Sequence, residues 1–152
     1  KNLPVCEEHP AKEFLLEVTE QMGLNLDLQV KADDSNVYVE ISGEDSGTII
    51  GKRGQTLDAI QYLTSLVVNK DKSNYIKVVV DAEDYRSRRE QTLEKLANRL
   101  AGKVVRSKRM VKLEPMNPYE RKVIHATLQG NSRVTTRSEG QDPYRRVIIE
   151  LK

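Results

Sequence analysis

The segment 49–57, with the sequence IIGKRGQTL, most constrains how this chain folds. Gly51 and Gly54 flank two cationic residues, Lys52 and Arg53, and aliphatic residues stand on both sides of this turn. Because neither glycine has a Cβ, the turn allows close approach of another backbone. Leucine and isoleucine recur at helical spacing after Gly54, which predicts a turn between two helices. Its backbone amides and two cations suit contact with a sugar–phosphate backbone.

A nucleotide-binding P-loop is the main rival interpretation of these glycines. That motif requires G-x-x-x-x-G-K-[ST] between a strand and a helix. Gly47 lies four residues before Gly51, one residue too close, and Arg53 takes the place of the hydroxyl that binds magnesium. The sequence therefore argues against hydrolysis of ATP or GTP.

Apolar spacing around the turn predicts a complete α/β unit. After an irregular lead-in over 1–11, we expect a helix over 12–22 and strands over 26–30 and 37–41. A short helix ending at residue 50, a helix over 55–69 and a strand over 75–80 follow. A second unit follows with a long helix over 83–105, a short strand over 110–113, a helix over 117–129, and strands over 134–138 and 145–151. Asn117-Pro118 is a typical helix start. We place the domain boundary at 82/83, between domains 1–82 and 83–152.

The two halves carry opposite charge. Residues 1–80 hold 8 Lys and Arg against 13 Asp and Glu, a net charge of −5, whereas residues 81–152 hold 17 against 10, a net charge of +7. A basic half indicates a polyanionic partner, because phosphate neutralisation releases counterions.

Cysteine content and hydropathy indicate where the chain works. Cys6 is the only cysteine, which excludes an intrachain disulfide and is typical of a reducing cytosol. No apolar run approaches the ~20 residues of a membrane span. We therefore expect a cytoplasmic protein without membrane insertion. The chain begins at Lys1 rather than Met, so we expect a fragment of a longer protein.

A second cationic motif lies in the helix predicted over 117–129. Arg121 and His125 are separated by one helical turn and fall on the same face. At about 100° per residue, these two, Lys122 and Gln129 share one polar arc, while Tyr119 points to the other side. We expect this arc to meet solvent or a ligand, since a guanidinium beside an imidazole suits phosphate contact and base stacking. A half-exposed histidine without function is the alternative.

The segment 49–57 resembles the signature of the KH domain, and the predicted element order matches its type II form. In that family the GXXG loop clamps about four nucleotides by their backbone. The resemblance implies that Gly51 and Gly54 allow close approach and that Lys52 and Arg53 supply charge.

The second unit resembles the R-3-H domain, a small α/β domain with a three-stranded sheet that binds single-stranded nucleic acid. The resemblance rests on MNPYERKVIHATLQG at 116–130, followed by VTTRSEG and PYRRVII. It implies nucleic-acid contacts from Arg121 and His125, with Lys122, Arg137 and Arg145 as accessory contacts. Successive strand residues face opposite sides, so only one of Arg145 and Arg146 shares the site.

A KH domain followed by an R-3-H domain identifies the chain as a member of the bacterial Jag, or SpoIIIJ-associated, family. Many members carry a further N-terminal domain and a linker. The resemblance implies a non-catalytic binder of single-stranded RNA, with single-stranded DNA left open. It also implies post-transcriptional regulation linked to cell elongation, division or sporulation, and dimerisation with itself or with a small single-KH protein.

Two other functions compete with RNA binding. A protein-interaction module with weak RNA binding is favoured by the acidic first half. A nuclease is disfavoured, because His9 and His125 are the only histidines and no Asp, Glu or His spacing resembles a metal site. We therefore expect no enzyme activity, no catalytic residue, no cofactor and no metal.

Overall fold

The computed structural model describes residues 2–152 and divides them into two compact units, of which the first ends at Arg86 and the second is Ser87–Lys152. Both units combine helices with a sheet, which confirms the predicted mixed α/β class. The predicted boundary at 82/83 stays a prediction. The long helix α4 (Tyr85–Ser107) contributes its first two residues to the first unit and the rest to the second.

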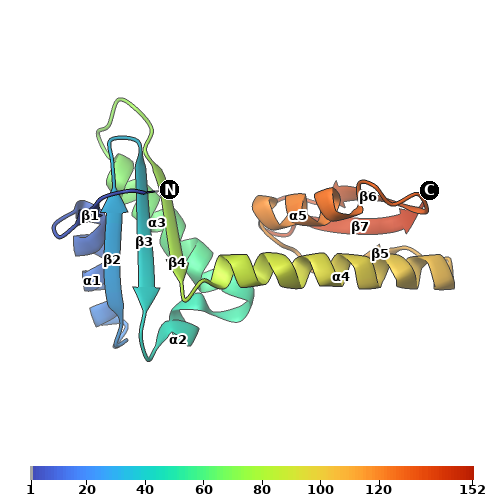
Figure 1. The fold of residues 1–152 in the computed structure, drawn as a ribbon, viewed down its shortest axis with the longest axis horizontal. Coiled ribbons are helices and arrows are strands. Elements are labelled where there is room, and N and C mark those ends of the chain that lie inside the picture. Colours follow the sequence, from blue (N-terminus) through green and yellow to red (C-terminus); the bar gives the residue numbers. More distant parts are fainter. Residues whose placement is uncertain (1) are drawn as a thin grey trace. The chain divides into compact units, whose positions relative to one another are not determined.

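The first unit contains a four-stranded sheet with the order β1-β2-β3-β4. Strands β2 (Asp27–Ala32) and β3 (Asn36–Ser42) form an antiparallel hairpin, and β4 (Lys77–Ala82) lies parallel to β3. The helices α1 (Pro10–Gln21) and α3 (Gln55–Asn69) cover one face of the sheet (Figure 1). The short α2 (Ser46–Ile50) precedes α3, so the order α1, β2, β3, α2, α3, β4 is the one predicted for a type II KH domain.

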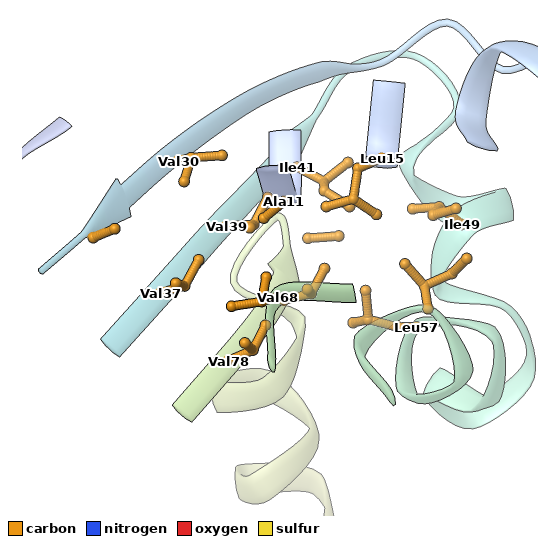
Figure 2. Packing of buried hydrophobic residues seen from close by; sticks show 14 residues of the cluster. Ala11, Leu15, Val30, Val37, Val39, Ile41, Ile49, Leu57, Val68 and Val78 are labelled. Atoms are coloured by element: carbon orange, nitrogen blue, oxygen red, sulfur yellow. The ribbon is translucent and has the colours of Figure 1, made fainter. Parts of the chain in front are cut away.

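The core of this unit follows from alternation along the strands. Val37, Val39 and Ile41 point to the helices and are at most 2% exposed. They belong to one apolar core with Leu15 of α1 and Leu57 of α3, and Figure 2 shows Ile41 beside Leu15. Burial of this apolar face fixes the helices on the sheet, and with them the turn that joins α2 to α3.

The outer edge of β4 is closed by side chains rather than by another strand. The Asn69 side chain accepts a hydrogen bond from Ile76 N at 2.7 Å and donates one to Ile76 O at 2.9 Å. The side chain of Gln61 accepts from Val80 N, and the Arg86 Nε donates to Val80 O, both at 2.9 Å. Both polar backbone groups of Ile76 and of Val80 therefore have side-chain partners.

The predicted irregular lead-in over 1–11 is wrong in part. Val5–Cys6 forms the short strand β1, which pairs with β2 and places Cys6 opposite Val30. Helix α1 begins at Pro10, where the His9 Nδ1 accepts a hydrogen bond from Ala11 N at 3.0 Å. Two residues are too few to show the alternation that predicts a strand.

The second unit has a three-stranded sheet with the order β5-β7-β6, as predicted for its fold. Its strands are β5 (Val111–Lys112), β6 (Val134–Glu139) and β7 (Arg146–Leu151), and β7 is antiparallel to both neighbours. Helix α5 (Pro118–Leu128) shares one apolar core with α4 and this sheet, which includes Leu93, Ile124 and Ile149. The strand β6 lies at an edge of the sheet, beside α5.

Candidate nucleic-acid interface

The GKRG turn is a single tight connection between α2 and α3. Gly51 ends α2 with φ 73° and ψ −170°, and a short 3-10 turn, η1 (Lys52–Gly54), follows. Arg53 and Gly54 both adopt left-handed backbone, with φ of 52° and 75°. The aliphatic residues on either side, Ile49 and Leu57, are fully buried. The core therefore holds both ends of the turn, as predicted, while the turn lies between them.

Both glycines are required by the protein's own packing as well as by their positive φ. A Cβ on Gly51 would overlap the side chain of Thr56. A Cβ on Gly54 would lie 2.6 Å from Cε2 of Tyr85, the first residue of α4. The motif alone attributes these glycines to close approach of a ligand backbone. Contact with Tyr85 is a further reason that spacing could not indicate, because 31 residues separate the two in sequence.

Arg86 fixes the residues that support the turn. Its backbone N donates to Asp81 Oδ1 at 3.2 Å, and its NH1 donates to Asp58 Oδ1 at 2.8 Å. Asp58 lies in the first turn of α3, directly after the GKRG turn. These bonds connect the end of β4, the start of α4 and the start of α3, which leaves the turn little freedom to change shape.

The two cations of the turn differ in exposure. Lys52 is exposed, whereas Arg53 is half-buried and already makes contacts within the protein. Lys52 is thus available to a phosphate, and Arg53 can serve one only by sharing or exchanging its present contacts.

Arg121 occupies a different position from the predicted polar arc. The core face of α5 consists of Glu120, Arg121, Ile124 and Leu128, and Arg121 is only 8% exposed. Its NH1 donates to Met116 O at 2.7 Å and to Asp142 Oδ1 at 2.9 Å. The prediction that Arg121 faces solvent is wrong because Arg121 lies about 60° from Ile124 and about 20° from Leu128 around the helix.

Tyr119, assigned to the side opposite the arc, is 59% exposed and its hydroxyl donates to Glu90 Oε1 at 2.6 Å. The start of α5 agrees with prediction, since Asn117 Oδ1 accepts from Glu120 N at 2.8 Å. The start of the helix was thus predicted correctly, whereas the exposure of Arg121 and of Tyr119 was not.

His125 is half-buried and both of its ring nitrogens have hydroxyl partners on β6. Nδ1 lies 2.6 Å from Thr136 Oγ1, and Nε2 lies 2.8 Å from Ser138 Oγ. Partial burial lowers the pKa of His125 below its usual 6.5, and the charges of Arg121 and Arg145 lower it further. The imidazole is therefore neutral near pH 7, donating through one nitrogen and accepting through the other.

The hydroxyls of Thr136 and Ser138 were not predicted as partners of His125, although their spacing in the sequence indicates a shared face. Thr136 and Ser138 are two residues apart in a predicted strand, so they point to the same face. That face meets α5, because the residues paired with them, Ile149 and Val147, belong to the core shared with α5.

The three accessory residues do not all gather at His125. Lys122 is exposed on α5, and Arg145 is near enough for its charge to lower the pKa of His125. Arg137 lies between Thr136 and Ser138 and so points to the opposite face of the sheet. There its Nε donates to Glu150 Oε2 at 2.9 Å. The predicted accessory role of Arg137 beside His125 therefore lacks geometric support.

A shallow groove of about 400 Å³ lies between α5 and the edge strand β6. Lys122, His125, Gln129, Thr135, Thr136 and Lys152 are among its lining residues. Two cations, an imidazole, an amide and hydroxyls are groups that bind phosphates and base edges. Gln129 belonged to the predicted arc, whereas Lys152 lies after the last strand and no motif pointed to it.

Neither a metal centre nor a spanning helix emerges from the described chain. Residues 2–152 contain no group of three or more His, Cys, Asp or Glu side chains placed to hold a metal ion. Within the same residues, every helix is too short or too polar to cross a bilayer.

Comparison with known proteins identifies both units. The KH domain family of KhpA and KhpB matches residues 12–80, and the R-3-H domain family matches residues 91–151. The chain is 54% identical over 144 residues to RNA-binding protein KhpB of Clostridium symbiosum. The matched region covers 93% of the chain and 65% of the relative. It is 41% identical over 144 residues to RNA-binding protein KhpB of Bacillus subtilis, covering 93% and 69%.

A third relative, RNA-binding protein KhpB of Lactiplantibacillus plantarum, is 38% identical over 140 residues, covering 92% of the chain and 44% of the relative. The chain thus spans from 44% to 69% of the length of these three proteins. A KH domain followed by an R-3-H domain, with this identity over nearly the whole chain, shows that it belongs to the KhpB, or Jag, family.

Proposed function

We propose that this chain is a non-catalytic binder of single-stranded RNA that uses one site in each unit. The observation that carries the proposal is the GKRG turn, whose left-handed backbone and buried flanks hold Lys52 at the surface. KH and R-3-H domains are binding domains, and the relatives are named as RNA-binding proteins. Single-stranded DNA is the competing ligand, because the 2′-hydroxyl decides between the two.

In the first unit, Gly51 and Gly54 keep the turn open to a nucleic-acid backbone. Lys52 neutralises a phosphate, and Arg53 contributes a second charge from its half-buried position. Tyr85 and Arg86 support the turn from within the protein and touch no ligand.

In the second unit, the groove between α5 and β6 binds the single-stranded RNA. His125 and Lys122 line the groove and contact the nucleic acid. Arg121 acts from behind, since its guanidinium joins Met116 O to Asp142 and so fixes the segment that leads to Arg145. Arg145 then supplies charge near His125.

The turn is tested by reversing its charge. Lys52→Asp with Arg53→Asp should weaken binding of a single-stranded oligouridylate in filter-binding or anisotropy titrations. The slope of log affinity against log salt concentration should become shallower by about 1.4, because each lost phosphate contact on a single strand contributes about 0.7 to that slope. Lys70→Asp with Lys72→Asp is the matched control, since both are exposed lysines of the same unit. Equal affinities for the two folded variants would refute a role of the turn.

The groove is tested separately with Lys122→Ala and His125→Ala. Each should reduce the affinity for RNA. Linked sites raise affinity through effective concentration, so combining a groove variant with the GKRG variant should add the two losses of binding free energy. Replacing the oligouridylate by oligodeoxyuridylate measures the contribution of the 2′-hydroxyl. Unchanged affinity in both groove variants would remove the second site from the proposal.

The cellular role that follows is post-transcriptional regulation in the bacterial cytoplasm, linked to cell elongation, division or sporulation. Crosslinking followed by sequencing of bound RNA in the native bacterium tests it. Recovery of no transcript above background would contradict the regulatory role.

A second function, protein association through the first unit, is favoured by an apolar surface on α3. Tyr62, Leu63, Leu66 and Val67 lie at i, i+1, i+4 and i+5 on this helix and are between 38% and 65% exposed. Such a stripe is typical of helix–helix contacts. We propose that it joins the chain to a second copy or to a small single-KH protein.

Association is tested by Leu66→Glu, with Leu16→Glu on α1 as the control at similar exposure, 52% against 47%. Sedimentation across a concentration range should show a dimer for the parent and the control, and a monomer for Leu66→Glu. A monomeric parent would exclude the homodimer, and failure to capture a purified single-KH protein would exclude the heterodimer.

A further inference from the structure

Helix α4 has one face committed to the core of the second unit. Leu93, Ala97, Ala101 and Val104 are at most 2% exposed and pack into the same cluster as α5 and the sheet. At about 100° per residue these four lie within an arc of about 80°. From Leu93 to Arg106 the opposite side of the helix carries no apolar side chain, and its cations are exposed.

Four cations occupy that opposite side from Leu93 onward. Lys95, Arg99, Lys103 and Arg106 also fall within an arc of about 80°, centred about 160° from the centre of the buried face. All four are exposed, and within residues 2–152 none of them makes an ion pair. At 1.5 Å per residue they form a line about 16 Å long. We call this line the α4 stripe.

The stripe differs from an ordinary solvated helix face. Such faces usually alternate Glu and Lys at i and i+4, which stabilises the helix, whereas like charges at this spacing destabilise it. Lys95, Arg99 and Lys103 are successive like-charge pairs at i and i+4. Residues 95–113 contain seven Lys and Arg and no Asp or Glu. The repulsion is relieved when a polyanion lies along the helix.

We propose that the α4 stripe binds the phosphate backbone of RNA, as a third contact besides the GKRG turn and the α5–β6 groove. The inference rests on the proposed RNA binding and adds a site that neither motif includes. A stripe without aromatic or amide groups reads no base, so it binds independently of sequence. An anionic membrane is the less suitable partner, because a helix on a bilayer inserts an apolar face and that face of α4 is inside the core.

The test removes the charge and keeps the helix. Lys95→Gln, Arg99→Gln, Lys103→Gln and Arg106→Gln are combined, since Gln has a helix propensity close to that of Lys and Arg. The control is Lys12→Gln, Lys70→Gln and Lys72→Gln, which removes cations from the first unit. Affinity for a single-stranded oligouridylate, long enough to span several sites of about 4–16 nucleotides each, is measured across salt concentrations. Circular dichroism and thermal unfolding verify the fold.

The stripe variant should show a salt dependence shallower by about 2.8, which is about 0.7 for each of four phosphate contacts. The control should keep the parent's slope. Without RNA, the stripe variant should be at least as stable as the parent, because like-charge pairs are gone. If the fourfold variant fails to fold, the pairs Lys95→Gln with Arg99→Gln and Lys103→Gln with Arg106→Gln should each change the slope by about 1.4.

A slope unchanged from the parent, while Lys52→Asp with Arg53→Asp still weakens binding, overturns the stripe and leaves the proposed function intact. A parent that binds no oligouridylate overturns both. Vesicles of phosphatidylglycerol and phosphatidylcholine form the third arm of the experiment. Binding to these vesicles that depends on the stripe, with the RNA slope unchanged, would assign the stripe to a membrane surface instead.

Discussion

Replacing Arg121 by methionine tests whether Arg121 supports the site from within the protein or contacts RNA directly. Methionine keeps an apolar stem and removes the guanidinium that donates to Met116 O at 2.7 Å and to Asp142 Oδ1 at 2.9 Å. An unpaired buried carbonyl costs about 1–3 kcal/mol. The Asp142 side chain is 57% exposed, so its ion pair adds about 0–1 kcal/mol. Arg121→Met should therefore lower the free energy of unfolding of the second unit by about 1–4 kcal/mol.

Urea unfolding followed by circular dichroism measures this loss. Arg133→Met is the matched control, because Arg133 is exposed on the same unit and its change should stay within about 0.5 kcal/mol. RNA affinity is then measured in conditions where Arg121→Met remains folded. If the variant unfolds like the parent but loses as much affinity as His125→Ala, Arg121 is a direct contact and the supporting role is refuted.

Three further perturbations probe the same framework. Gly54→Ala should lower the free energy of unfolding by about 1–2 kcal/mol from its left-handed backbone alone, and by more because the new Cβ meets the ring of Tyr85; urea unfolding unchanged from the parent would refute this. The pKa of His125 is lowered in the folded protein, so near and below pH 6.5 the unfolded chain binds more protons than the folded one. The free energy of unfolding should therefore fall as pH drops through 6.5 and below, and should fall less in His125→Gln. Equal pH profiles for both proteins would contradict that assignment. Asn69→Ala should cost about 1–3 kcal/mol by leaving the half-buried N–H and C=O of Ile76 unpaired, and faster hydrogen exchange at Ile76 should accompany the loss.

The element order could be predicted because long periodic segments carry their own signal. Val37, Val39 and Ile41 alternate, and the helix after Gly54 repeats its apolar residues at helical spacing. Strand β1 could not be predicted in this way, since pairing with β2 alone makes Val5–Cys6 a strand. Its existence depends on a partner far along the chain.

The candidate site was predictable in its motifs and not in its contacts. Lys52 is exposed as the motif implies, but Arg121 is buried because an arginine at the edge of an apolar arc can turn its guanidinium to a carbonyl and a carboxylate. The partners of His125 come from β6, and Tyr85 reaches Gly54 from the end of the first unit. Such contacts between distant segments leave no periodic signal.

The side chains along the outer edge of β4 also limit how this protein can assemble. An exposed edge strand is a template on which another chain can add a strand. At Ile76 and Val80 the positions that an added strand would use are already taken by Asn69, Gln61 and Arg86. An added strand cannot pair with Ile76 or Val80, so these side chains disfavour edge-to-edge addition of further copies of this unit at this side.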